Sequence, residues 1–226
     1  QDGLASFEPA YVDELAVIIE WAFEYIQREG EEEMEERWLR EEKGGSVYLR
    51  LSTRPLEQLR RALAPELRDD IIKGGYWLRS PEPGCELAIA YMGAVAPEAI
   101  EAAGLLAEDR RGVGVLAVTS ADRLSAGWHG AQRVREHGEL SVRAHIEQLL
   151  GALPRDAALI TVCDAHPETL SWIGSVLGHR VRPLGVEHFG QSGSIPELYG
   201  HYGLDVNAIL GAAEGLSRRP VRYRFL

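Results

Sequence analysis

The clearest chemical signal in the sequence is a glycine-bracketed turn at residues 188–194, His-Phe-Gly-Gln-Ser-Gly-Ser. Ser194, Pro196 and Glu197 have the spacing of a helix start, with a serine cap, an early proline and a capping-box glutamate. Such a turn can bind an anion, because free backbone N–H groups and the helix dipole point the same way. The glycines could equally serve a tight connection that needs positive φ. The candidate residues for an anion or interface turn are His188, Gly190, Gln191, Ser192, Gly193 and Ser194.

Two other groups of reactive residues give weaker signals. Asp164 and His166 follow a predicted strand at its carboxyl end, where open α/β sheets place ligands, and could form a charge-relay pair or half of a metal site. Because no further cluster has metal-ligand spacing, we interpret both residues as structural and predict no metal site. Ser192 lacks the Gly-x-Ser-x-Gly context of a nucleophile elbow, which argues against a hydrolase. We assign no catalytic residue.

A regular alternation of strands and helices positions these residues. Continuous apolar runs, typical of buried parallel strands, occur at 86–92, 114–119, 157–163 and 181–186. Helices are predicted between and after them at 97–109, 121–129, 145–151, 168–177, 194–202 and 206–216. The predicted fold is therefore α/β, with three α/β/α layers around a mostly parallel, mixed sheet. The more polar segment 71–79 is expected to be an antiparallel edge strand.

The first 70 residues follow a different pattern. Apolar residues recur with helical spacing over 8–27, from Val12 to Ile26, and a strand is predicted at 46–52. The charged run at 31–43 is interpreted as a solvated helix extension or a flap. Residues 56–70 suit a linker with a short helix.

Composition excludes some classes of function. The chain has 226 residues and a formal net charge of −11, which argues against nucleic acid as a partner. No apolar run approaches the roughly 20 residues of a membrane span. We interpret Cys85 and Cys163, both in apolar runs, as buried free thiols of a cytoplasmic protein.

Several motifs, taken in order, resemble the C-terminal region of thiamine-diphosphate-dependent enzymes of the transketolase and 2-oxo-acid dehydrogenase superfamily. Phe-Gly-x-Ser-Gly at 189–193 is followed by Leu198 and by Gly-Leu-Asp at 203–205. Three more segments are similar to the single-chain pyruvate dehydrogenase first component: Lys-Gly-Gly-Tyr at 73–76, Tyr-Met-Gly at 91–93 and Val-Thr-Ser at 118–120. Those enzymes tend to have Asp-Gly where this chain has Glu187-His188, and Gln-Ser-Gly at 191–193 is nearer to the transketolase form. The substrate class therefore stays open.

The resemblance implies that the parent enzyme uses thiamine diphosphate and Mg²⁺. The Gly-Asp-Gly motif of the diphosphate-binding domain is absent from this sequence, and residues 8–54 resemble only the last helix and strand of the pyrimidine-binding domain. We therefore expect a fragment that holds no cofactor and does not catalyse alone. Its expected parts are a pyrimidine-domain remnant at 1–55, a linker at 56–70 and a transketolase-type C-terminal domain at 71–226.

The resemblance also gives one candidate substrate-binding residue. Arg54 lies at a strand end where transketolases carry a Ser-Arg that binds the substrate phosphate, although this chain has one extra position after Ser52. A planar guanidinium suits a phosphate because it offers two parallel charge-assisted hydrogen bonds. A surface or interdomain ion pair is the alternative interpretation of Arg54.

Two functional hypotheses follow. In the first, the parent is a 2-oxo-acid (pyruvate-type) dehydrogenase component, an oxidoreductase or decarboxylase, or else a transketolase, which is a transferase. This region would then support a homodimer and shape the active-site rim, and an acyltransferase component of a 2-oxo-acid dehydrogenase complex would be a partner. In the second, the chain is a non-catalytic interaction or regulatory module that binds a multienzyme-complex partner or a small anionic ligand.

Overall fold

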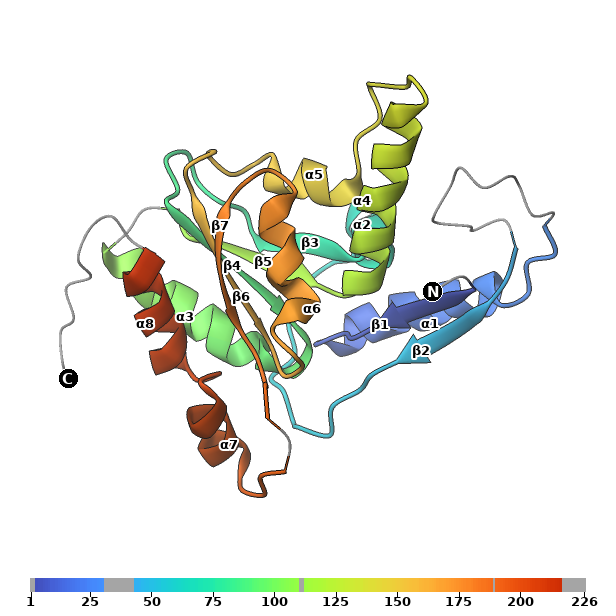
Figure 1. The fold of residues 1–226 in the computed structure, drawn as a ribbon. Coiled ribbons are helices and arrows are strands. Elements are labelled where there is room, and N and C mark those ends of the chain that lie inside the picture. Colours follow the sequence, from blue (N-terminus) through green and yellow to red (C-terminus); the bar gives the residue numbers. More distant parts are fainter. Residues whose placement is uncertain (1–2, 31–42, 110–111, 189, 217–226) are drawn as a thin grey trace. The chain divides into compact units, whose positions relative to one another are not determined.

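The computed structural model describes residues 3–30, 43–109, 112–188 and 190–216 (Figure 1). Contacts divide the chain into two compact units. The first unit combines residues 1–76 with 118–150, and the second combines 77–117 with 151–226. The charged run predicted at 31–43 lies outside the described residues except for Lys43, which forms an isolated antiparallel bridge with Glu29.

A five-stranded sheet with the order β3-β5-β4-β6-β7 is the main architectural element. Its centre is parallel: Leu87 of β4 pairs with Ala158 of β6, which pairs with Arg180 of β7. Every residue of the central strands is buried, as the continuous apolar runs predict for strands covered on both faces. These strands are β4 (Leu87–Met92), β5 (Gly114–Val118) and β6 (Ala158–Cys163), with β7 (Arg180–Leu184) at one edge.

β3 (Gly75–Arg79) forms the other edge and runs antiparallel to β5. The Thr119 N–H donates to the Gly74 carbonyl at 2.9 Å, and the Glu82 N–H donates to the Gly112 carbonyl at 3.3 Å. Residue numbers therefore fall along β5 as they rise along β3, which confirms the predicted antiparallel edge strand. The predicted start at residue 71 is wrong, because α2 (Pro65–Lys73) continues to a left-handed Gly74.

The helices of the second unit complete a three-layer α/β/α arrangement. α3 (Ala96–Asp109) and α8 (Val206–Leu216) pack against each other and the sheet, and α6 (Glu168–Ser171) covers β6 and β7 from the other face (Figure 1). The predicted helix at 168–177 is only partly correct, because residues 172–175 form the 3-10 turn η2. Gly174 lies so close to β7 that a Cβ atom there would stand 2.2 Å from the Val181 side chain. The short elements η1 (Gly93–Val95) and α7 (Ile195–Tyr202) complete this unit.

The first unit contains a second, smaller sheet. β1 (Leu4–Phe7), which the sequence did not predict, pairs in parallel with β2 (Ser46–Leu49). The Ser120 hydroxyl donates to the Ser6 carbonyl at 2.5 Å and the Glu8 N–H donates to the Thr119 carbonyl at 2.8 Å, so β1 is tied to the segment before α4. The helices of this unit are α1 (Val12–Tyr25), α2, α4 (Ala121–Glu136), which is longer than predicted, and α5 (His145–Leu150).

No helix among the described residues is long and apolar enough to cross a membrane.

Candidate functional site

The predicted glycine turn connects β7 to α7 in the second unit. Gly190 has φ +106°, a conformation that residues with a side chain rarely adopt, and its surroundings are open. His188 and the residues from Gly190 to Ser194 are exposed, and Phe189 lies outside the described residues. The turn is therefore accessible, as a ligand or interface site requires.

The start of α7 is already capped by a carboxylate. The Ser194 N–H donates to Glu197 Oε2 at 2.9 Å, and the Ser194 hydroxyl donates to the same oxygen at 2.7 Å. These two hydrogen bonds hold the pKa of Glu197 below its usual value. The capping box is thus confirmed, and it places a negative charge where an anionic ligand would approach.

A shallow cavity of about 560 Å³ opens between β7, the end of α7 and α8. Arg182 and Glu187 provide its charges, and neither side chain has a hydrogen bond or ion pair to another described residue. An unpaired cation in a concave surface could attract an anion, although Glu187 opposes it. The remaining lining residues are Pro167, Pro183, Leu184, Gly185, Tyr202, Gly203, Ala208, Gly211, Ala212, Gly215 and Leu216.

Arg54, the predicted phosphate-binding residue, lies in the first unit. It is half-buried, in a segment without helix or strand between β2 and α2, and its N–H donates to the Ser52 hydroxyl at 3.0 Å. The structure therefore places Arg54 and the glycine turn in different compact units.

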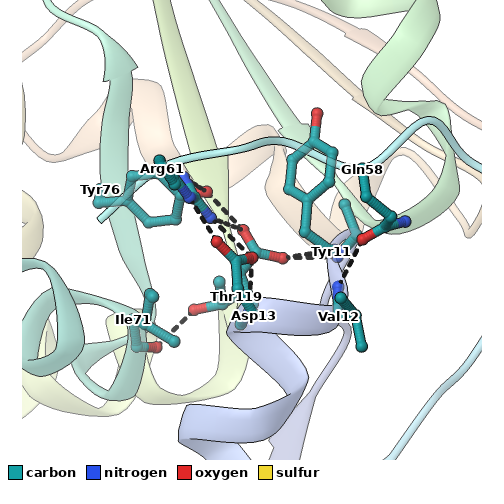
Figure 2. A network of polar contacts seen from close by, with 10 residues as sticks. Tyr11, Val12, Asp13, Gln58, Arg61, Ile71, Tyr76 and Thr119 are labelled. Carbon is teal, nitrogen blue, oxygen red and sulfur yellow. Dashed lines mark hydrogen bonds and ion pairs between the residues drawn. The ribbon is translucent and has the colours of Figure 1, made fainter. Parts of the chain in front are cut away.

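A buried polar network in the first unit was not predicted (Figure 2). Its centre is Glu14 in the first turn of α1, which is 1% exposed. Glu14 Oε2 accepts the N–H groups of Ala10 at 2.7 Å and Tyr11 at 2.9 Å, and Oε1 accepts the Tyr76 hydroxyl at 2.5 Å. Burial raises the pKa of Glu14, and these hydrogen bonds oppose that shift. The carboxylate thereby joins α1 to the start of β3.

Arg61, in the linker between β2 and α2, also belongs to this network. Its guanidinium forms two hydrogen bonds with Asp13, at 2.6 Å and 3.1 Å, and donates to the Tyr76 hydroxyl at 2.8 Å. It also lies over the rings of Tyr11 and Tyr76, at 5.6 Å and 5.0 Å from their centres. Burial lowers the pKa of Arg61, but the bonds to Asp13 and Tyr76 outweigh burial and raise it overall.

The same network holds Tyr76 in its neutral form. Burial, and next the nearby Glu14 carboxylate, raise the pKa of the Tyr76 phenol, so it stays a hydrogen-bond donor. A second contact joins the linker to α1: Gln58 Oε1 accepts a hydrogen bond from the Val12 N–H at 2.8 Å. The groups bond to one another, so the arrangement orders the linker against α1.

The histidine sites give no reactive constellation. His166 Nδ1 accepts the Glu168 N–H at 3.3 Å, which is a local contact at the start of α6. Across the described ranges, no three His, Cys, Asp or Glu side chains lie close enough together to hold a metal ion. We therefore derive no catalytic step from the described residues.

The comparisons with known proteins agree with the three-layer α/β/α arrangement. The fold defines an α/β domain of the transketolase C-terminal type. Residues 74–205 match the family described as the transketolase-like TK C-terminal domain. This match covers more than half of the chain, and the chain therefore belongs to this family.

Solved structures show the same fold over nearly the whole chain. A transketolase variant from Pichia stipitis matches with 17% identity and a TM-score of 0.58, covering 95% of this chain and 25% of that one. The transketolase from Campylobacter jejuni matches with 18% identity and a TM-score of 0.57. The match covers 92% of this chain and 26% of that one. A split-gene transketolase, described as an inactive beta4 tetramer, matches with 18% identity and a TM-score of 0.60. The match covers 95% of this chain and 58% of that one. The chain thus spans about a quarter of the first and second of these proteins and over half of the third. No curated protein matches it by sequence.

Proposed function

We propose that this chain is the C-terminal part of a cytoplasmic thiamine-diphosphate-dependent enzyme, either a pyruvate-type 2-oxo-acid dehydrogenase component or a transketolase. The observation that carries the proposal is the family match at residues 74–205. In the parent enzyme this region supports a homodimer and shapes the rim of an active site whose thiamine diphosphate and Mg²⁺ are held elsewhere. The chain alone is inactive.

The small sheet of the first unit supports the proposal of a pyrimidine-domain remnant at 1–55. β1 and β2 form a parallel pair of four residues each. Parallel strands normally lie inside larger sheets covered on both faces, and a two-stranded sheet is marginal by itself. Tyr48 of β2 is 55% exposed, which leaves aromatic surface for neighbouring elements to cover. Further strands of a larger domain would complete this unit.

Calorimetry tests the cofactor part of the proposal. The chain of 226 residues should show no micromolar binding of thiamine diphosphate with Mg²⁺. Adding the polypeptide that carries the Gly-Asp-Gly motif, encoded upstream or by a neighbouring gene, should restore binding and activity. Micromolar binding by the chain alone would contradict the proposal, as would the lack of any such coding sequence.

Arg54 distinguishes the two substrate classes. If the parent is a transketolase, Arg54→Ala in the full-length enzyme should raise the KM for a phosphorylated sugar with little change in kcat, because uniform binding is lost. Arg60→Ala, an exposed arginine of the same segment, is the matched control. An unchanged KM would remove Arg54 from the site, and activity with pyruvate would identify the dehydrogenase class.

A second candidate function rests on the cavity beside β7. The Arg182 side chain there lacks a partner among the described residues, which favours a regulatory module that binds a small anion. Titration with inorganic phosphate, followed by NMR, should shift residues that line the cavity in the wild type but not in Arg182→Ala. Arg180→Ala, on the same strand but outside the lining, should behave like the wild type. A pull-down with the acyltransferase component tests the alternative protein partner.

A further inference from the structure

The cavity beside β7 opens where α/β sheets usually bind their ligands. Pro167 follows the carboxyl end of β6, and Leu184, Gly185 and Glu187 lie at or just beyond the carboxyl end of β7. Sheets of parallel strands place their ligand crevices at these strand ends. The volume of about 560 Å³ is that of a small-molecule site. All of the lining residues belong to the second unit, so one compact part of the chain forms the cavity.

Two opposite charges line this cavity without pairing with each other. The side chains of Arg182 and Glu187 are both exposed, and neither forms a hydrogen bond or an ion pair with any residue that the structure describes. The two charged groups therefore lie farther apart than a direct ion pair allows, which leaves space for a ligand between them. A ligand carboxylate would suit the guanidinium, and a ligand ammonium would suit the carboxylate, because each would form charge-assisted hydrogen bonds.

The rest of the lining is mainly apolar and leaves room beside helix α8. Leu184 and Leu216 contribute aliphatic side chains, whereas α8 contributes small residues, including Gly211 and Gly215. A Cβ atom at Gly211 would meet no atom within 4 Å apart from the backbone of its own helix, so the space next to it is open. An aliphatic group of a ligand could therefore lie against α8 and be removed from water there.

The charge of the whole chain favours a ligand without net charge over an anion. The formal net charge is −11, and Glu187 places a further negative group in the cavity itself. An anion approaches against this field, whereas a zwitterion does not. We propose that the cavity binds a small aliphatic α-amino acid, with its carboxylate on Arg182 and its ammonium on Glu187. The proposal deepens the second candidate function, the regulatory binding of a small anion, and rests on it for the role of Arg182.

Titration of the 226-residue chain with L-leucine and L-valine, followed by NMR, tests the class of ligand. We expect a Kd of about 0.1–1 mM, because a ligand of so few atoms forms few contacts. 4-Methylpentanoate lacks only the ammonium of leucine, and 3-methylbutylamine lacks only its carboxylate. Each should bind at least about tenfold more weakly than leucine, because one buried charge pair is lost. Binding of neither amino acid, or equally tight binding of 4-methylpentanoate, overturns the proposal.

Charge-removing variants assign the two ends of the ligand. Arg182→Gln and Glu187→Gln should each raise the Kd for L-leucine at least about tenfold. Arg180→Gln and Glu214→Gln are the matched controls, because both residues are exposed charges of β7 and α8 outside the lining, and they should leave the Kd unchanged. If Glu187→Gln binds L-leucine as the wild type does, the cavity recognises a carboxylate alone and the zwitterion proposal is wrong.

Filling the cavity tests its location without removing a charge. Gly211→Leu places a side chain in the open space beside α8 and should abolish the NMR shifts caused by L-leucine. Its Tm should not fall, because leucine is a better helix former than glycine. Gly104→Leu is the matched control: Gly104 lies in α3, also has open surroundings, and does not line the cavity. A folded Gly211→Leu that binds L-leucine normally places the ligand elsewhere and overturns the proposal.

Inorganic phosphate separates this proposal from the candidate function on which it rests. If phosphate shifts the lining residues and neither amino acid does, the anion-binding module is supported and the zwitterion proposal is wrong. If the amino acids bind and phosphate does not, the zwitterion proposal is supported and a simple anion site is wrong. If none of these probes binds, both are wrong, while the thiamine diphosphate binding expected of the parent enzyme is unaffected.

Discussion

The buried network around Glu14 and the glycine turn around Gly190 are both polar, but they are organised in opposite ways. In the network, hydrogen bonds and an ion pair join Glu14, Tyr76 and Arg61 to one another. In the turn, the side chains of Gln191 and Ser192 are exposed, and Ser194 hydrogen-bonds to Glu197 in the helix cap. The network is thus suited to stabilising the fold, and the turn is suited to binding a ligand or another subunit.

The difference shows that exposed polar groups are available for binding, whereas buried polar groups must bond to one another. A buried carboxylate without its partners costs several kcal/mol, so each group of the network is committed to its neighbours. An exposed turn carries no such constraint, and its residues stay available for a ligand or a subunit.

The largest effect is expected for Glu14→Ala. It leaves two backbone N–H groups and the Tyr76 hydroxyl without their acceptor and opens a cavity, which should cost about 3–5 kcal/mol of the free energy of unfolding. Thermal unfolding should show a drop in Tm of roughly 10 °C. Glu24→Ala, an exposed glutamate of the same helix, should change Tm by only a degree or two. Equal effects of the two variants would contradict the closed network.

Tyr76→Phe should have an intermediate effect. Only the hydroxyl is lost, which leaves Arg61 and Glu14 each with one unmet bond and should cost about 1–3 kcal/mol. Chemical denaturation should show a lower midpoint with an unchanged slope. The control Tyr48→Phe, at a side chain that is 55% exposed, should leave the midpoint in place. A neutral Tyr76→Phe would mean that the hydroxyl does not hold the network together.

Gly190→Ala should destabilise the turn by about 1–2 kcal/mol, because alanine is strained at a φ of +106°. Gly193→Ala is the matched control: its φ is not in the left-handed region, and its Cβ would stand 3.4 Å from Glu197 Oε2, an ordinary contact. Denaturation of both variants measures the difference. If the two glycines respond alike, the turn is not fixed by backbone strain at Gly190.

The sequence predicted the sheet well because each central strand is a continuous apolar run, and it predicted the capping box because Ser194 and Glu197 are neighbours. It did not predict the network, because Glu14 and Tyr76 are 62 residues apart and Arg61 lies in a polar linker. The acidic pair Asp13-Glu14 at a helix start was the available signal, but it reads equally well as a solvated first turn. Helical periodicity found α1 yet not its buried face, because both faces are apolar.

The smallest effect is expected at Glu197, and it depends on pH. Hydrogen bonds from the Ser194 hydroxyl and N–H lower its folded pKa below the usual 4.5. The stability it contributes is therefore present above that unfolded value and is lost as pH falls through the folded value. NMR titration should place the Glu197 midpoint below 4.5. Ser194→Ala removes the hydroxyl donor and should move the midpoint back toward the usual value, while the N–H bond retains part of the shift. A midpoint at or above the usual value would mean that this carboxylate does not cap α7 in solution, and the helix start in the exposed turn would then be open to an external anion after all.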